Sequence, residues 1–206
     1  MISNKQRGFS LLELLITIAI GMTIAGVTFI AMRPLFNRSH IDNAYDTTLM
    51  ALRDTRHLAI TQSHQYYVTF NPAGYSAGTI LVQYQPAAVA GVLPALQMVK
   101  TYTIPTDIQF AVAAGFPANS PDNFGTGITA IDFGQGLGAG SLTYVCFMPD
   151  GSSRDQLGNY NSGVVYLTRP LDDKYSSRAI SVWGATGRVR GWRLNQQAGA
   201  PVWMQQ

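Results

Sequence analysis

Hydrophobic residues follow three different patterns along the chain. Residues 8–32, GFSLLELLITIAIGMTIAGVTFIAM, contain a run from Leu14 to Met32 without a charged residue. From Phe36 to about Ser63 the apolar residues recur at spacings of three, four or seven, and beyond Gln65 the period changes to two. These periods predict an apolar helix, then a helix with one apolar face, then a series of β-strands.

The apolar run is long enough to cross a membrane. Its 19 residues would extend for about 28 Å as a helix, close to the ~30 Å hydrocarbon core of a bilayer. Lys5 and Arg7 precede the run with no acidic residue among them, which predicts that this end stays in the cytoplasm. Glu13 lies at the mouth of the run, where a charge needs a partner because it is costly in lipid.

The segment GFSLLELL resembles the processing site of type IV pilins and pseudopilins. In that family a prepilin peptidase cuts after the glycine, and the new amino terminus is methylated. The resemblance implies a leader of residues 1–8 that ends at Gly8, with Phe9 as the first, N-methylated residue of the mature chain. Glu13 then takes the family's glutamate position, and we expect its carboxylate to pair with the Phe9 amine of a neighbouring subunit during assembly.

Two other interpretations of the N-terminus remain. An ordinary secretory signal predicts a short apolar core and a small-x-small cleavage site, whereas this run is long and a helical pattern continues past it. A plain signal anchor is the second interpretation, and it would assign no role to Glu13. The spacing of glycine, aromatic residue and glutamate favours the pilin type. It implies a single-pass inner-membrane protein with a periplasmic C-terminal domain, and other pilins as partners through the N-terminal helix.

The rest of the chain predicts an α+β fold. A transmembrane helix over 9–33 should kink near Pro34, which removes a backbone donor and clashes with the preceding turn. Over 34–63 one apolar stripe should lie on an antiparallel sheet, with most charged residues off it; its members are Ile41, Tyr45, Leu49, Leu52 and Ala59. Residues 64–206 should form the β domain, with seven or eight strands in one or two sheets; the segments are 65–70, 75–84, 98–104, 107–112, 128–133, 142–148, 163–168 and 178–184.

Candidate enzymatic and metal-binding features are weak. The glycine-rich segment 134–140 leads into a β pattern instead of a helix, so it lacks the helix N-terminus of a dinucleotide site. His57 and His64 lie seven residues apart on one helix face, which favours a structural or solvent-facing role over metal binding. The single cysteine, Cys146, lies in the apolar run TYVCFM and excludes an intrachain disulfide. We expect neither enzymatic activity nor a cofactor.

Two further segments resemble the FimT/GspH group of minor pilins and pseudopilins. LMALRDTRHLAITQSHQYYVTF carries the group's Arg-x-x-Ala-Ile pattern at Arg56, Ala59 and Ile60. VCFMPDGSS, GVVYLT and RAISVWGATGRVR follow in the order of the group's C-terminal strands and its Gly-Arg element. In FimT-like minor pilins this Gly-Arg-x-Arg element is implicated in binding DNA during uptake.

The C-terminal segment is basic and free of acids. After Asp173 it contains only positive charges, at Lys174, Arg178, Arg188, Arg190 and Arg193. Gly187 predicts a turn, after which residues 188 and 190 project from one face of a strand and residue 193 from the other. Paired guanidinium groups suit phosphate oxygens, and such contacts are independent of sequence. Trp192 is placed to stack on an unpaired base.

These features predict a FimT-like minor pilin at a filament tip that binds DNA non-specifically for uptake in natural transformation. The alternative is a structural minor pilin or type II secretion pseudopilin, similar to GspH, that primes assembly without binding DNA. In that case the C-terminal arginines would pair with Asp172, Asp173 or a neighbouring subunit. A major fibre subunit fits less well, because major pilins commonly carry a C-terminal disulfide loop.

Overall fold

A long helix followed by β-strands makes up the protein. The computed structural model describes residues 10–117, 121–134, 142–170 and 172–206. Two compact units divide the chain, Met1–Ser39 and His40–Gln206, and helix α1 (Leu11–Gln62) begins in the first and ends in the second. The helix continues through Pro34, and the kink predicted there stays a prediction. The predicted processing site at Gly8 and Phe9 lies outside the described residues.

The first unit contains the candidate membrane span. Leu11–Phe29 comprises 19 residues with a mean hydropathy of 2.0, which is long and apolar enough to cross a bilayer. The hydroxyl groups of Thr17, Thr23 and Thr28 donate hydrogen bonds to carbonyl groups three or four residues earlier in the helix. These bonds satisfy polar groups that would otherwise face an apolar environment.

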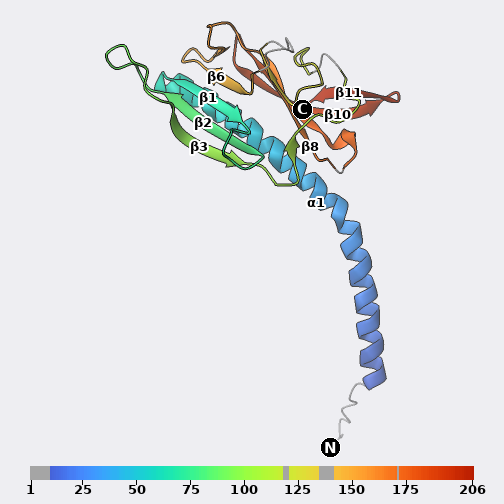
Figure 1. The fold of residues 1–206 in the computed structure, drawn as a ribbon. Helices are drawn as coiled ribbons and strands as arrows, with labels where there is room; N and C mark the ends of the chain where they lie inside the picture. Colours follow the sequence, from blue (N-terminus) through green and yellow to red (C-terminus); the bar gives the residue numbers. More distant parts are fainter. Residues whose placement is uncertain (1–9, 118–120, 135–141, 171) are drawn as a thin grey trace, which may run out of the picture. The chain divides into compact units, whose positions relative to one another are not determined.

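Two antiparallel sheets form the second unit, so the predicted α+β class is confirmed (Figure 1). The first sheet has the strand order β3 (Gln97–Thr103), β2 (Thr79–Gln85), β1 (Gln65–Phe70), β6 (Tyr144–Phe147) and β7 (Ser153–Arg154). The second has the order β11 (Ala200–Gln205), β10 (Arg188–Gln197), β9 (Arg178–Trp183), β8 (Gly163–Thr168) and β4 (Gln109–Phe110). Strand β5 (Ile131–Phe133) also pairs with β8, and a short 3-10 helix η1 (Lys174–Ser176) precedes β9.

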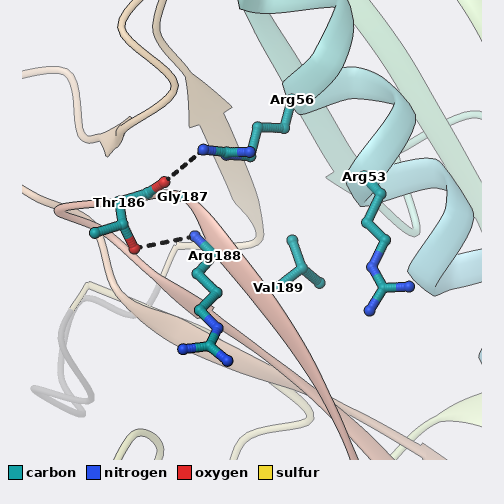
Figure 2. A pocket seen from close by; sticks show the side chains of 6 residues that line it. All are labelled: Arg53, Arg56, Thr186, Gly187, Arg188 and Val189. Atoms are coloured by element: carbon teal, nitrogen blue, oxygen red, sulfur yellow. Dashed lines mark hydrogen bonds between the residues drawn. The ribbon is translucent and has the colours of Figure 1, made fainter.

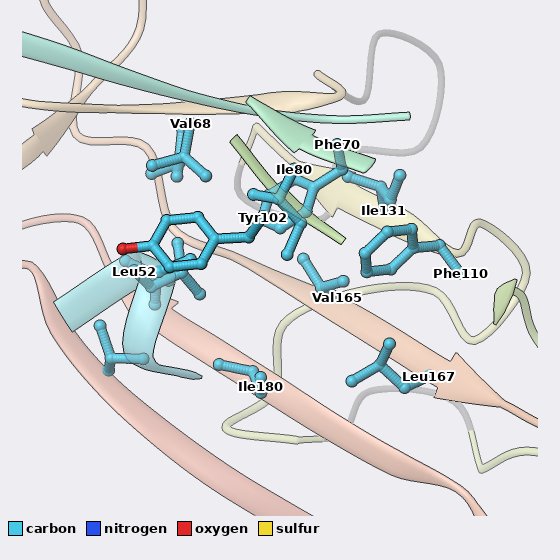
Figure 3. Close-up of a cluster of buried hydrophobic side chains, with 14 of the residues drawn as sticks. Leu52, Val68, Phe70, Ile80, Tyr102, Phe110, Ile131, Val165, Leu167 and Ile180 are labelled. Carbon is cyan, nitrogen blue, oxygen red and sulfur yellow. The ribbon is translucent and has the colours of Figure 1, made fainter. Parts of the chain in front are cut away.

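The C-terminal part of α1 packs against both sheets. The predicted apolar stripe is confirmed, since Ile41, Tyr45, Leu52 and Ala59 are buried and Leu49 packs against the same cluster. Figure 3 shows Leu52 with side chains from both sheets; the first sheet contributes Val68, Phe70, Ile80 and Tyr102, and the second contributes Val165, Leu167 and Ile180. Burial of this apolar surface stabilises the unit and fixes α1 against the sheets.

The second sheet also has a packed outer face. Val164, Tyr166, Ala179, Leu194 and Trp203 form a separate buried cluster there. On β10, Val189 belongs to the cluster that faces α1 and Leu194 belongs to the outer cluster. Side chains of consecutive strand residues alternate between faces. Residues 188, 190, 192 and 194 therefore share the outer face, and residue 193 lies on the face toward α1. The prediction that residue 193 lies on the face opposite residues 188 and 190 is confirmed.

Some predicted strands have different bounds. The second begins at Thr79 instead of Tyr75, because Gly78 adopts φ +80° and donates its N–H to Asn71 Oδ1 at 2.8 Å, which extends the turn. The segment 107–112 contains only the two-residue strand β4. Strand β11 was not predicted, since its sequence APVWMQ contains a proline. Pro201 nevertheless pairs with Gln196 on this edge strand, a location that tolerates proline.

Candidate anion-binding site

The turn between β9 and β10 is built around Gly187. Both Thr186 and Gly187 donate their N–H groups to Trp183 O, at 3.3 and 2.6 Å. Gly187 has φ +60°, and a Cβ atom there would lie 2.0 Å from Gly151 O. Only glycine combines this conformation with such a close backbone approach. The β9–β10 turn therefore packs directly on the turn at Pro149–Ser152. This close packing explains why the Gly-Arg element has a glycine at position 187.

Arg56 connects these two turns to α1. Its Nε donates to Gly151 O at 3.1 Å, and its Nη2 donates to Thr186 O at 3.0 Å. Hydrogen bonds from a charged donor are stronger than neutral ones. Arg56 therefore holds both turns against the helix, which gives a physical role to the arginine of the Arg-x-x-Ala-Ile pattern.

Beside Arg56 lies a hollow of about 500 Å³ lined by three arginines; its lining residues are Arg53, Arg56, Thr186, Gly187, Arg188 and Val189 (Figure 2). Arg53 and Arg188 are exposed. Across the described ranges, neither guanidinium group has a hydrogen bond or ion pair to protein. The neighbouring turn contributes Asp150, whose carboxylate is bonded to Ser152 and to Arg154 Nη2 at 3.4 Å. The hollow thus carries positive charge that its own lining does not neutralise.

The structure separates the five predicted C-terminal cations. Arg188 pairs with Trp183 at the turn end of the β9–β10 ladder, whereas Arg193 pairs with Arg178 at the other end. Five residues of β-strand span about 17 Å. Lys174, in η1, precedes β9 and therefore belongs to the Arg178 end. The five candidate cations are therefore spread along the β9–β10 ladder and do not gather at the Gly-Arg element.

Arg178 is a structural residue. It is 3% exposed, its Nη2 lies 2.7 Å from Asp42 Oδ1, and its Nη1 donates to Ser176 O at 2.7 Å. Burial lowers the pKa of its guanidinium, and the hydrogen bond that the guanidinium donates to Asp42 counteracts this effect. Its guanidinium is therefore engaged within the protein, which disfavours the expected contact with DNA. Arg193, half-buried beside it, lies on the same face of the sheet.

Arg190 is also engaged within the protein. Its Nη1 forms an ion pair with Asp122, so the partner is neither Asp172 nor Asp173. Asp172 instead pairs with Arg169, at 3.3 Å. Trp192, expected to stack on a base, is half-buried, and its indole N–H donates to Ser181 Oγ at 2.9 Å. The aromatic side chain opposite Arg188 in the ladder is Trp183, which is 39% exposed.

Other candidate chemistry finds no support in the described residues. No group of three or more His, Cys, Asp or Glu side chains that could hold a metal ion occurs among them. His64 packs near the ring of Tyr84, with centroids 5.8 Å apart. Cys146 is buried, and desolvation raises the pKa of its thiol to about 11, so it stays protonated at neutral pH. Most of the predicted glycine-rich loop, from residue 135 onward, lies outside the described residues.

Comparison with known families decides the class of the N-terminus. The model of the prokaryotic N-terminal methylation motif matches residues 3–29. In this chain the motif leads into α1 and the antiparallel sheets. The N-terminus of this chain is that of a type IV pilin-like protein. No curated protein sequence matches this pilin-like protein significantly.

One solved structure resembles the pilin-like protein at low identity. It is the crystal structure of the type IV minor pilin FimU of Pseudomonas aeruginosa, at 11% identity and a TM-score of 0.44. The match covers 76% of this chain and 90% of that chain.

Two members of the hollow were missed as site residues. Arg53 is a charged residue off the apolar stripe, a position that by itself indicates no function, and Arg56 belongs to the Arg-x-x-Ala-Ile pattern. Both are more than 120 residues from Arg188 in the sequence. Three arginines that the fold brings together from distant segments leave no local motif. The sequence shows only that Arg53 is a basic residue on the polar side of the helix, and such a residue by itself indicates a solvated face.

Proposed function

We propose that this pilin-like protein is a FimT-like minor pilin that binds the DNA backbone at the β9–β10 turn. This proposal rests on the hollow beside Gly187. There Arg53 and Arg188 are exposed, and the lining contains no acidic side chain. An uncompensated pair of guanidinium groups is suited to phosphate oxygens. The binding is electrostatic and independent of sequence. It supplies DNA for uptake while α1 anchors the subunit in the inner membrane and in the filament, with His40–Gln206 in the periplasm.

Among the predicted cations, Arg188 makes the principal contact. Arg190 contributes less because Asp122 engages it, and Arg193 and Lys174 lie at the far end of the ladder. Trp183 replaces Trp192 as the aromatic residue beside the contact, because it is exposed and opposite Arg188. Aromatic side chains stack on unpaired bases, so single-stranded DNA gains an additional contact at this turn.

The test is a salt titration of the full chain in detergent with two labelled duplexes of unrelated sequence. Wild type should bind both with equal affinity, and Arg188→Ala should weaken both alike. The slope of log affinity against log salt should fall by about 0.9 for one lost phosphate contact. Lys100→Ala is the matched control, because Lys100 is an exposed cation on β3 in the other sheet. Absence of binding by wild type at low salt would overturn the proposal.

The second candidate is a structural minor pilin or GspH-like pseudopilin that does not bind DNA. The ion pairs of Arg178 with Asp42 and of Arg190 with Asp122 favour it, because these C-terminal arginines stabilise the fold. Measurements of DNA uptake and filament assembly in cells distinguish the two candidate functions. Arg188→Ala should abolish DNA uptake with filaments retained under the first, and should leave uptake unchanged or reduce filament assembly under the second.

A further inference from the structure

We propose that Arg53 of α1 and Arg188 of the β9–β10 turn act together as a clamp for one phosphate group of a nucleic-acid backbone. The inference rests on the proposed function and adds a binding residue outside the Gly-Arg element and outside the acid-free C-terminal segment. The clamp joins two elements separated by more than 130 residues in the sequence. Both residues line the hollow, and Figure 2 shows Arg53 on the helix and Arg188 on the strand, on either side of Val189.

The charges of the hollow favour an anion. Arg53, Arg56 and Arg188 line it, and like charges brought together raise the free energy of the unliganded protein. Throughout the described residues, Arg56 is the member of this trio whose guanidinium is bonded to protein, and its partners are neutral carbonyl groups. A bound phosphate would neutralise part of this charge and accept hydrogen bonds from Arg53 and Arg188.

The backbone of both clamp residues is fixed before any ligand binds. Arg53 is flanked by Leu52, fully buried in the core, and Arg188 is followed by Val189, buried in the same core. Arg56 adds a direct link between α1 and the turn through its bond to Thr186 O. It is therefore a positioning residue for the clamp. Binding groups held on rigid elements lose less freedom on association, which increases affinity.

The volume of the hollow suits a phosphodiester. About 500 Å³ falls within the range of small-ligand pockets, roughly 300–1,000 Å³. Three of its lining residues, Arg53, Thr186 and Arg188, are exposed, so the hollow is accessible to a phosphate of a continuous strand. The site thus needs only one phosphate from the chain and places no demand on the bases.

The experiment measures duplex binding by full-length wild type, Arg53→Ala, Arg188→Ala and the double variant, in detergent and at several salt concentrations. Each single variant should weaken binding roughly tenfold, as expected for one charge-assisted hydrogen bond. The double variant should lose less than the product of the two single effects, because the residues share one phosphate. Arg53→Lys should keep the salt slope of wild type but lose affinity, since lysine lacks the guanidinium fork. Lys100→Ala should match wild type.

The outcomes separate the clamp from the underlying function. If wild type does not bind, the proposed function fails. If wild type binds and Arg188→Ala weakens binding while Arg53→Ala matches wild type, or if the two effects multiply, the clamp is wrong and DNA binding stands. Binding to vesicles containing an anionic phospholipid is measured in parallel. Loss of vesicle binding in Arg53→Ala without loss of DNA binding would assign the hollow to lipid phosphate and overturn the clamp.

Discussion

The Nη1 atom of Arg190 lies 2.7 Å from Oδ1 of Asp122, whose side chain is only 5% exposed. The same carboxylate accepts a hydrogen bond from the Ser181 hydroxyl, and that hydroxyl oxygen accepts one from the Trp192 indole. Asp122 itself adopts φ +56°, an uncommon conformation for a non-glycine residue. Arg190 therefore fixes the loop around Asp122 on the outer face of the second sheet.

Removal of Arg190 should destabilise the protein. Arg190→Ala leaves a buried carboxylate without its cation, which typically costs about 3–5 kcal/mol. Arg188→Ala, in the same strand and on the same face, removes an exposed arginine and should change stability by less than about 0.5 kcal/mol. Thermal unfolding followed by near-ultraviolet circular dichroism measures both. Equal melting temperatures for the two variants would contradict a structural role for Arg190.

This pair also shows how far the sequence determines the site. The alternation along β10 correctly placed residues 188 and 190 on one face and residue 193 on the other. The alternation does not reveal that Arg190 is engaged in an ion pair. Its partner, Asp122, lies 68 residues earlier in a loop without periodicity. Strand parity is a local property, whereas the partner of a charged side chain depends on loop packing.

The fold was more accessible to sequence than the site. The apolar stripe from Ile41 to Ala59 and most strand segments follow from local periodicity, which the core then reinforces. Strand β11 was not predicted, because Pro201 interrupts the run of strand-forming residues. The hollow could not be predicted from the sequence, because Arg53, Arg56 and Arg188 come together only through tertiary packing.

Gly187 should tolerate no side chain. Gly187→Ala combines a positive φ with a Cβ only 2.0 Å from Gly151 O, and at least about 2 kcal/mol of destabilisation is expected. Gly74→Ala is the matched control, since Gly74 has φ +85° but no atom within 4 Å of the added Cβ. The difference in melting temperature between the two variants isolates the contact with Gly151. Comparable stability of both would show that the β9–β10 turn can move away from the Pro149–Ser152 turn.

Asp107 should support stability at neutral pH. It lies 3.0 Å from His40 Nδ1 and 2.9 Å from Arg169 Nε. Burial raises the pKa of Asp107, but the hydrogen bond with His40, a backbone hydrogen bond and the nearby positive charges together hold it below its usual value. Because the folded-state pKa is depressed, this stabilisation is complete above the unfolded-state pKa, near 3.9. It is lost as the pH falls through the folded-state pKa.

The measurement is the melting temperature of wild type and Asp107→Asn between acid and neutral pH. The variant should be less stable at pH 7, by under about 1 kcal/mol for a partly exposed pair. The difference should shrink below about pH 4. Asp46→Asn is the control, because the described residues contain no ion pair to the exposed Asp46. A difference that stays constant through the acid range would exclude titration of Asp107 as its source.

The unit His40–Gln206 should fold without the apolar part of α1. It is compact by itself, and its core contains the buried stripe of α1 together with side chains from both sheets. Among the residues whose side chains the structure describes, the members of this core begin at Ile41. A protein of residues 40–206 should therefore give dispersed amide resonances by NMR and a cooperative melting transition. A collapsed spectrum without a transition would mean that the N-terminal segment is required for folding.

Glu13 should matter for assembly and not for processing. It is an acidic residue in the first turn of α1, exposed at the start of the candidate membrane span. A charged side chain in this environment is costly unless it is paired, and the predicted partner is the Phe9 amine of a neighbouring subunit. Glu13→Ala should therefore still be cleaved after Gly8 and inserted in the membrane, which mass spectrometry of the membrane fraction measures. Its share in sheared filaments, relative to the membrane pool, should fall strongly, and Glu13→Gln should behave in the same way because it keeps the size but lacks the charge. Normal incorporation of either variant would exclude the ion pair as the source of the assembly register.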